Sequence, residues 1–315
     1  MTFTKTSIRT LAGAACLATA GPALATDRTE PVVIPIVSDT STDLISTILG
    51  ATLEKAGYNI EYVDADYAAS FSGIQTGDLH FTVCWQSTME LCEGSTENGK
   101  AINAGSTGIR TAEGWWYPMS LKENCPGLPN WKALTEPACI EALATAETAP
   151  KARFVEGPAD WVMPVEEMAR AFDIDVEPIA SGSAAALVAT VSTAARRGEP
   201  VVAWGYTPHW YFMSDEGEFV EFPEYQEGCH DDPSWGANPD ATYDCNVETG
   251  VLWLFANKKF IDAEPEAAEI IEKFELEDSQ VTDGYRKVDV EGVPIETVTE
   301  QWMNENEAIW QAWLQ

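Results

Sequence analysis

The sequence is short of positive charge. Its 315 residues include 18 Lys and Arg against 51 Asp and Glu, which gives a formal net charge of −33. A nucleic-acid interface needs clustered Lys and Arg to displace counterions from phosphates, so this composition argues against a nucleic-acid partner. Material for a core is not lacking, because 45% of the residues are hydrophobic and 12 are Trp. We therefore expect a folded protein with an anionic surface suited to a saline medium.

The familiar motifs of catalysis are also missing. The chain contains no G-x-S-x-G, H-E-x-x-H or G-x-G-x-x-G sequence. Residues 94–100, GSTENGK, resemble the start of a phosphate-binding loop, but Ala101 stands where a Ser or Thr would bind Mg²⁺. An exported carbohydrate-active hydrolase stays open as a second hypothesis. Its two apposed carboxyls cannot be picked out among 51 acids.

The N-terminus predicts export. Lys5 and Arg9 precede a short, Ala-rich apolar stretch over residues 11–24, which ends in the small-x-small sequence of residues 23–25. These features are typical of a cleavable signal peptide, so we assign residues 1–25 to one and place the mature protein in the periplasm. No later segment approaches the run of about 18 apolar residues that a membrane-spanning helix needs.

The cysteines agree with an oxidising compartment. Six remain after residue 25, and an even number in an exported chain indicates disulfides. Fifteen pairings of six cysteines are possible. We predict the pairs that close short loops, namely Cys84–Cys92, Cys125–Cys139 and Cys229–Cys245.

Strand and helix patterns alternate along the chain. Residues 32–37 form an apolar run of strand length, residues 38–43 are rich in helix-starting residues, and apolar residues then recur at helical spacing to residue 53. Further strands are expected at 58–63, 79–84, 152–155 and 200–204, and helices at 68–76, 165–172, 184–197, 263–275 and 295–313. This order predicts an α/β fold in two halves, with a ligand in the crevice at the carboxyl ends of the strands.

The aromatic residues are placed unusually. Trp85 follows a strand, Trp161 lies in a Gly-Pro turn, and Trp204 and Tyr206 end another strand, while residues 115–117 are Trp-Trp-Tyr. Rings that converge on a crevice suit a quaternary ammonium group, because ring faces attract a diffuse cation that cannot donate a hydrogen bond. Ordinary core packing and carbohydrate stacking are the alternatives at this point.

At these residues the chain resembles a known family. Residues 77–85 (GDLHFTVCW), 157–161 (GPADW) and 205–210 (GYTPHW) are similar to segments of the substrate-binding proteins of ABC importers for glycine betaine, choline and related trimethylammonium osmolytes. The resemblance extends from about residue 27 to residue 315. It implies a two-lobed periplasmic binding protein of the hinge-bending type II, with the ligand in the inter-lobe cleft. Lobe 1 would comprise residues 26–113 and 223–315, and lobe 2 residues 114–222.

The resemblance also implies site residues and partners. Trp85 would form a wall of an aromatic cage from lobe 1, and Trp161 a wall from lobe 2. Tyr206 stands where the family usually has Trp, and we expect Trp204 on the same strand face to compensate. Trp116 is similar in position to a further aromatic in some members, although which of residues 115–117 faces the ligand stays open. The receptor is expected to be a monomer that docks on an inner-membrane ABC permease.

The ligand is predicted from a charge. Glycine betaine carries a carboxylate, yet no Arg adjoins the cage segments. Glu156, five residues before Trp161, would repel that carboxylate but could share a proton with an N-oxide oxygen. We therefore expect trimethylamine N-oxide, as in the binding proteins of marine bacteria that the chain resembles, with glycine betaine or choline as the alternative.

One acidic loop suggests a metal. Residues 229–246 form a turn-rich segment between two cysteines, and the oxygens of Asp240 and Asp244 could bind a structural Ca²⁺. The segment lacks the spacing of an EF-hand, so a solvated, disulfide-closed loop is the alternative. No other cofactor is expected.

Overall fold

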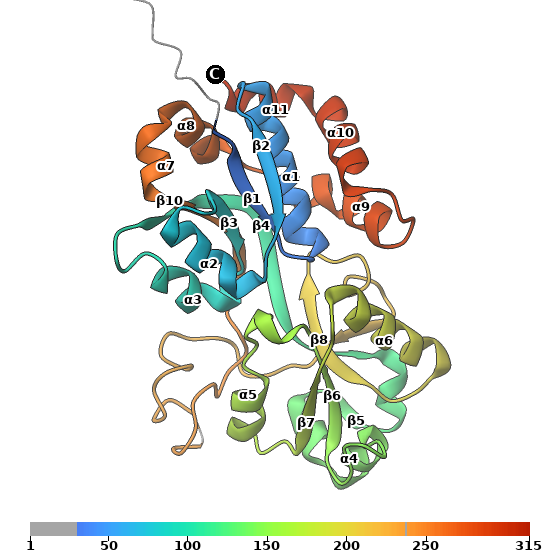
Figure 1. Cartoon of the computed structure of the whole chain (residues 1–315). Helices are drawn as coiled ribbons and strands as arrows, with labels where there is room; N and C mark the ends of the chain where they lie inside the picture. Colours follow the sequence, from blue (N-terminus) through green and yellow to red (C-terminus); the bar gives the residue numbers. More distant parts are fainter. Residues whose placement is uncertain (1–29, 237) are drawn as a thin grey trace, which may run out of the picture.

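The computed structural model describes residues 30–236 and 238–315, and these form two α/β lobes, one above the other in Figure 1. The upper lobe contains the first strands and the C-terminal helices, so the chain leaves this lobe and returns to it. The predicted two-lobed α/β fold is confirmed. The expected signal peptide, residues 1–25, lies outside the described residues.

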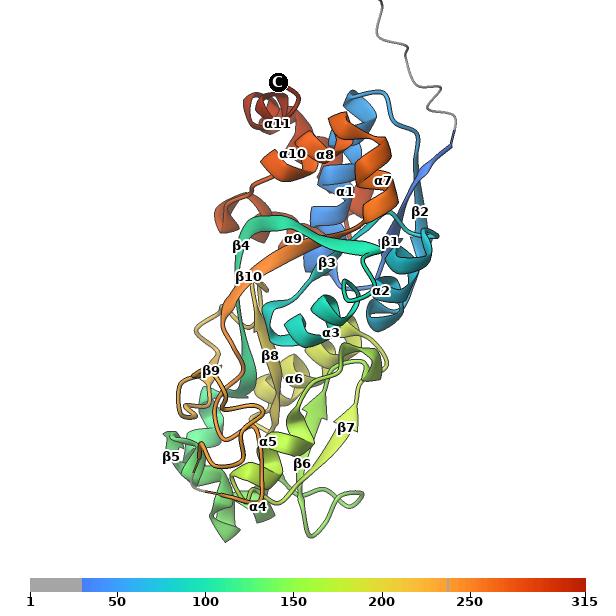
Figure 2. The ribbon, with the colours of Figure 1, turned by 90° about the vertical axis from the view of Figure 1, so that its left-hand side faces the viewer.

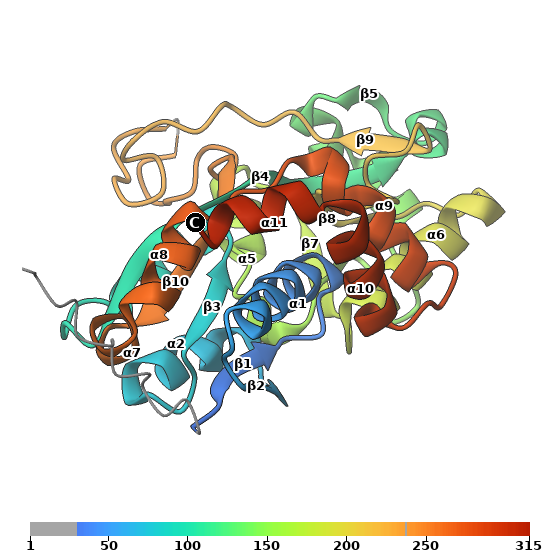
Figure 3. The same cartoon turned by 90° about the horizontal axis from the view of Figure 1, so that it is seen from above.

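The upper lobe is built around the buried helix α1 (Thr40–Lys55). Strand β1 (Val32–Ile36) precedes it and pairs in parallel with β2 (Ile60–Asp64), which gives the expected β-α-β unit. Figure 3 shows α1 between this strand pair and the C-terminal helices. The other helices of the lobe are α2 (Tyr67–Thr76), α3 (Met89–Gly94), α7 (Lys258–Ala263), α8 (Pro265–Lys273), α9 (Asp278–Asp289), α10 (Ile295–Glu305) and α11 (Glu307–Trp313).

A second sheet continues from the upper lobe into the lower one. Its strand order is β3-β10-β4-β8-β6-β7, and β9 pairs with β4 beside this path. The strands are β3 (Phe81–Cys84), β4 (Ala101–Pro118), β6 (Ala152–Glu156), β7 (Val176–Ala180), β8 (Val202–Thr207), β9 (Gly217–Phe219) and β10 (Gly250–Asn257), with β5 (Pro126–Pro129) apart from them. The lower lobe adds α4 (Pro137–Leu143), α5 (Val165–Ala171) and α6 (Ala184–Arg197), and short 3₁₀ turns lie at η1 (Gln86–Thr88), η2 (Met119–Glu123), η3 (Trp131–Thr135) and η4 (Ala159–Trp161).

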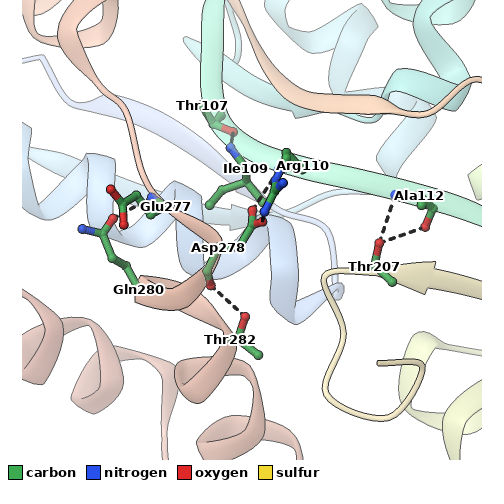
Figure 4. A network of polar contacts seen from close by, with 9 residues as sticks. All are labelled: Thr107, Ile109, Arg110, Ala112, Thr207, Glu277, Asp278, Gln280 and Thr282. Atoms are coloured by element: carbon green, nitrogen blue, oxygen red, sulfur yellow. Dashed lines mark hydrogen bonds and ion pairs between the residues drawn. The ribbon is translucent and has the colours of Figure 1, made fainter. Parts of the chain in front are cut away.

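Strand β4 belongs to both lobes, as Figure 2 shows from the side. Its 18 residues pair with β10 up to Thr111 and with β8 from Ala112 onward. Figure 4 shows the crossing: Arg110 is bound to Asp278 of α9, with the Arg110 backbone N 3.0 Å from Asp278 Oδ1, while Ala112 N donates to Thr207 Oγ1 at 3.0 Å. The strand is thus held by the upper lobe on one side of the crossing and by the lower lobe on the other.

A long loop separates β9 from β10. Within it, Asn246 N donates to Pro223 O at 2.8 Å, and Asn238 Nδ2 donates to Arg170 O of α5 at 3.3 Å. The second bond places the loop against α5 of the lower lobe. Near the end of the loop, Gln86 Nε2 of the upper lobe donates to Glu248 Oε2 at 2.9 Å, and the chain rejoins the upper lobe's sheet at Gly250. The division into residues 26–113 with 223–315 and residues 114–222 stays a prediction.

The helices differ from expectation near the C-terminus. The single helix expected over 295–313 is two helices, because Asn306 ends α10 and its Nδ2 donates back to Trp302 O at 2.9 Å. Helix α9 and strands β4 and β10 were not expected at all. In the described residues, no helix combines the length and the apolar character that crossing a membrane requires.

All three predicted disulfides are present, at Cys84–Cys92, Cys125–Cys139 and Cys229–Cys245. The second joins the start of β5 to α4 within the lower lobe, and both of its cysteines are buried. In the chain-entropy account, a disulfide stabilises the folded state by restricting the unfolded chain, to an extent set by the length of the closed loop.

Replacing Cys125 and Cys139 together by Ala should lower the free energy of unfolding by about 3 kcal/mol, the value for a loop of about 15 residues. Chemical denaturation under oxidising conditions measures the difference. With a strong reductant present, the variant and the unsubstituted protein should unfold at closely similar denaturant concentrations. Equal stability under oxidising conditions would contradict the prediction.

Candidate ligand-binding site

A cavity of about 460 Å³, counting its open mouth, lies between the lobes. The upper lobe supplies residues from the turn before α1, from the start of α2, from the end of β3 and from the crossing strand. The lower lobe supplies the turn after β6 and the end of β8. The lining residues are Val37, Asp39, Thr42, Tyr67, Trp85, Ser87, Thr88 and Glu113 on one side and Trp161, Val162, Met163, Pro164, Trp204 and Tyr206 on the other.

Aromatic rings from both lobes meet in this cavity. The Tyr206 ring centroid lies 5.5 Å from that of Trp85 and 5.4 Å from that of Trp161, and each Trp plane is at 86° to the Tyr206 plane. Trp204 lies two residues before Tyr206 on β8 and lines the same cavity. The structure therefore brings together four of the residues that the sequence suggested. Their contact with a ligand stays a prediction.

The backbone of Trp85 is held by a hydrogen bond to Tyr67. The backbone N–H of Trp85 donates to Tyr67 Oη at 3.0 Å, and the same oxygen lies 2.7 Å from Thr88 Oγ1. The disulfide of Cys84 begins one residue earlier and closes the turn that follows Trp85. These bonds fix the backbone from which the Trp85 ring extends.

Trp161 is positioned by the Gly-Pro turn after β6. A Cβ atom on Gly157 would lie 2.5 Å from Trp161 Cε3, so only glycine lets the ring lie against the backbone here. Val162, the next residue, has φ 57° and ψ 48°, a left-handed conformation that is rare for a β-branched residue. Such a conformation costs about 1–3 kcal/mol and persists only where the surroundings impose it.

Glu113 is a carboxyl buried in the cavity wall. Its Oε1 accepts from Trp204 Nε1 at 3.3 Å and its Oε2 accepts a short hydrogen bond from Ser87 Oγ. Burial raises the pKa of Glu113 to about 7, against the lowering effect of these two hydrogen bonds. Near neutral pH, Glu113 is therefore present both as an acid that can donate a proton and as a carboxylate.

Asp39 is the second buried carboxyl of the cavity. It is the N-cap of α1, where Oδ2 accepts from Thr42 N at 3.3 Å. Burial raises its pKa, while the hydrogen bond from the Thr42 backbone and the nearby His209 act in the opposite direction. Among the described residues that line the cavity, none has a basic side chain.

The aromatic triplet of residues 115–117 does not line the cavity. Successive side chains of a strand point to opposite faces, so Trp116 faces away from the side on which Glu113 lies. It is fully buried in the lower lobe against Tyr211 and Phe212, with ring centroids 5.4 and 5.5 Å away. Trp115 shares the face of Glu113 but packs against Phe154 of β6, at 4.6 Å.

Glu156 also lies outside the cavity lining. It is half-buried at the end of β6, and its pKa is raised by burial and then by the negative charges of Glu166 and Glu167 on the following helix. The carboxyl that the sequence argument required near the rings is present, but it is Glu113 that lies there.

The two proposed calcium ligands differ in burial, and each of them is hydrogen-bonded to Asn238. Asp244 is buried and its Oδ2 accepts from Asn238 N at 3.3 Å, while Asp240 is exposed and donates its own N–H to Asn238 Oδ1. A closer group of potential ligands, Cys229, His230 and Cys245, contains both cysteines of a disulfide and so lacks free thiolates. Calcium binding in this loop stays a prediction.

Sequence reasoning missed the cavity residues Asp39, Tyr67, Ser87 and Glu113. Asp39 lies in the segment that was expected to start a helix. It is the N-cap of α1, as expected, and its side chain also lines the cavity. Glu113 directly precedes the Gly-Trp-Trp-Tyr run, a position that could have marked it. The resemblance implied a change of lobe between residues 113 and 114, but nothing in the sequence predicted that this segment is a continuous strand.

The chain is similar to a known family and to proteins of known binding specificity. The family model for the substrate-binding domain of ABC-type glycine betaine transport systems matches residues 30–305. The trimethylamine N-oxide-binding protein of Pelagibacter ubique is 29% identical over 299 residues, which cover 92% of this chain and 93% of that protein. The glycine betaine/proline betaine-binding periplasmic protein of Salmonella typhimurium is 25% identical over 76% of this chain and 74% of its own length.

Solved structures show the same fold. An ABC-transporter choline-binding protein in complex with choline superposes with a TM-score of 0.72 at 15% identity, covering 90% of this chain and 91% of its own. The lactococcal OpuAC protein, closed on glycine betaine, gives 0.69 at 14% identity over 91% of this chain and all of its own. At these identities the likeness concerns the fold alone.

Replacing Ser87 by Ala should raise the pKa of Glu113 above about 7, because the lost hydroxyl donor stabilises the carboxylate. Carbon-13 NMR titration of the glutamate carboxyls measures the change. Glu156 provides an internal control, since its pKa depends on other neighbours and should stay the same. A lower or unchanged pKa of Glu113 would show that the Ser87 bond does not stabilise the charged form.

Proposed function

Because the chain belongs to the family of substrate-binding domains of ABC-type glycine betaine transport systems, we propose that it captures trimethylamine N-oxide in the periplasm and delivers it to an inner-membrane ABC permease. Proteins of this family are transport receptors for quaternary amines, not enzymes, and this chain is one of them. The choice of trimethylamine N-oxide among such ligands is the part that we propose. We further propose that the receptor works as a monomer.

The chemistry of the cavity lining carries the choice. Its aromatic rings suit a trimethylammonium group, with each ring contact contributing roughly 0.5–2 kcal/mol. Its two buried carboxyls, Asp39 and Glu113, come without a basic side chain in the described lining. A ligand that carries its own carboxylate would be repelled by the ionised forms of these two groups, which disfavours glycine betaine.

Glu113 distinguishes the remaining ligands. Its acid form can donate a hydrogen bond to the oxygen of an N-oxide, and burial makes this form available near neutral pH. The 29% identity to a trimethylamine N-oxide-binding protein supports the same choice. Choline is the second candidate, because its full positive charge and its hydroxyl would both favour an ionised carboxylate at this position.

Capture then depends on closure of the lobes. Trp85 belongs to the upper lobe, Trp161, Trp204 and Tyr206 belong to the lower lobe, and Glu113 lies on the strand that crosses between them. A ligand that contacts both sets binds the closed arrangement better than an open one, so it shifts the population toward closure. The closed form is the one that the permease would receive.

Affinity for trimethylamine N-oxide should fall about tenfold between pH 6 and pH 8, because binding requires the protonated form of a carboxyl that titrates near pH 7. Affinity for choline should rise over the same interval, since an ionised carboxylate attracts the cation. Isothermal titration calorimetry at both pH values measures each ligand. Choline binding tightly where trimethylamine N-oxide gives no heat would reverse the assignment.

The same titration with Glu113→Gln tests the residue directly. The amide can still donate a hydrogen bond, so trimethylamine N-oxide should bind at pH 6 within a few-fold of the unsubstituted protein and should lose its pH dependence. Glu156→Gln is the matched control and should leave both the affinity and its pH dependence unchanged. A pH dependence that survives in Glu113→Gln would assign the titration to another group.

Trp161→Ala should weaken binding about tenfold by removing one ring of the cage, with little change in thermal stability because the side chain is only half-buried. Trp310→Ala removes another half-buried Trp, in α11, that does not line the cavity, and this variant should bind normally. Calorimetry and a thermal melt of both variants make the comparison. Equal affinities would remove Trp161 from the cage.

A further inference from the structure

One hydrogen bond joins the two lobes beside the cavity. The backbone N–H of Tyr67, the first residue of α2 in the upper lobe, donates to Asp160 Oδ2 in η4 of the lower lobe at 2.8 Å. Both partners adjoin the aromatic cage. Tyr67 itself lines the cavity, and Asp160 directly precedes Trp161.

Helix α2 has no side-chain cap of its own. Its N-cap residue, Asp66, makes no side-chain hydrogen bond to the first turn and is exposed to solvent. The first N–H groups of a helix have no partner inside the helix, and the positive end of its dipole favours a nearby carboxylate. The carboxylate of Asp160, from the other lobe, bonds the first of these groups.

Tyr67 connects this bond to the opposite wall of the cage. Its hydroxyl oxygen accepts the backbone N–H of Trp85 at 3.0 Å. The path from Asp160 through Tyr67 to Trp85 therefore links the turn that carries Trp161 to the turn that carries Trp85. The left-handed Val162, two residues after Asp160, indicates that this segment is held in place by its surroundings.

We propose that Asp160 is a positioning residue that caps α2 across the cleft and so fixes the spacing between Trp85 and Trp161 around the ligand. This inference rests on the proposed function, because it concerns the affinity of the same cavity. The bond spans the cleft, so it stabilises the closed arrangement of the lobes against reopening, both with and without ligand. Its loss should act mainly on the rate of ligand release.

Asp160→Ala should weaken trimethylamine N-oxide binding by about tenfold to a hundredfold, as expected for a lost hydrogen bond to a charged group, mostly through faster release. Asp160→Asn keeps an oxygen that can accept from Tyr67 N–H, so its loss should be smaller. Asp66→Ala is the matched control. It removes the same charge from the same helix end without removing a bond across the cleft, and it should bind like the unsubstituted protein. Stopped-flow fluorescence of the tryptophans gives both rate constants.

Two results would overturn the inference. One is an unchanged release rate in Asp160→Ala, and the other is an equal loss in Asp66→Ala, which would point to general electrostatics around the helix end. A control melt of the ligand-free variants should show nearly equal stability, because the bond lies across the cleft and not within a lobe.

Amide hydrogen exchange separates this inference from the proposed function. If the unsubstituted protein binds none of the three ligands, the proposed function fails. Exchange at the Tyr67 amide in the ligand-free protein then decides the inference. It should be faster in Asp160→Ala than in the unsubstituted protein and in Asp66→Ala, and equal rates in all three would overturn the assignment.

Discussion

The structure depends on one strand that serves two lobes. β4 pairs with β10 above the crossing and with β8 below it, and the change of partner occurs between Thr111 and Ala112. Glu113 follows directly, so the carboxyl is placed where neither lobe alone surrounds it. On the lower side, β8 pairs with β4 so that Trp204 is the register partner of Trp115 and Tyr206 that of Glu113. All four side chains therefore lie on one face of the sheet. The position of the acid among the rings is thus a consequence of strand register at the crossing.

The site balances two opposing electrostatic effects. Burial makes the ionised forms of Asp39 and Glu113 costly, while hydrogen bonds from Thr42, Ser87 and Trp204 recover part of that cost. Glu113, whose pKa is raised to about 7 by burial, can therefore exchange a proton near neutral pH. The large negative charge of the surface, by contrast, acts on any cation at a distance and is weakened by salt. In the proposed function, the choice of ligand therefore depends on the two buried acids and not on the net charge.

Much of the fold could be predicted because its signals are local. The β1-α1-β2 unit, the helix-starting segment at Asp39 and the three disulfides follow from residues close together in sequence. The aromatic residues at strand ends could also be found, since Gly and Pro near Trp161 and Tyr206 mark the places where these strands end. Strand β4 could not, because positive-φ glycines at 105, 108 and 114 interrupt its pattern. Helix α9 was hidden by its polar surface, with Val281 and Tyr285 buried on its inner side. Glu113 was missed because it lies on β4, whose strand pattern could not be recognised. The acid expected near the rings was therefore assigned to Glu156.

The double connection of Tyr67 has a consequence for how sequence change reaches the site. Its bond to Asp160 comes from the backbone, so every residue except proline can supply it at position 67. Its bond to Trp85 comes from the phenol oxygen, which phenylalanine lacks. The hydrogen bond across the cleft is therefore kept by most substitutions at position 67 but lost when Asp160 is replaced by a residue without an acceptor. The hydrogen bond to the Trp85 backbone is lost when Tyr67 is replaced by phenylalanine. Substitutions at positions 160 and 67 would therefore act on different walls of the proposed cage, although a single residue joins the two walls.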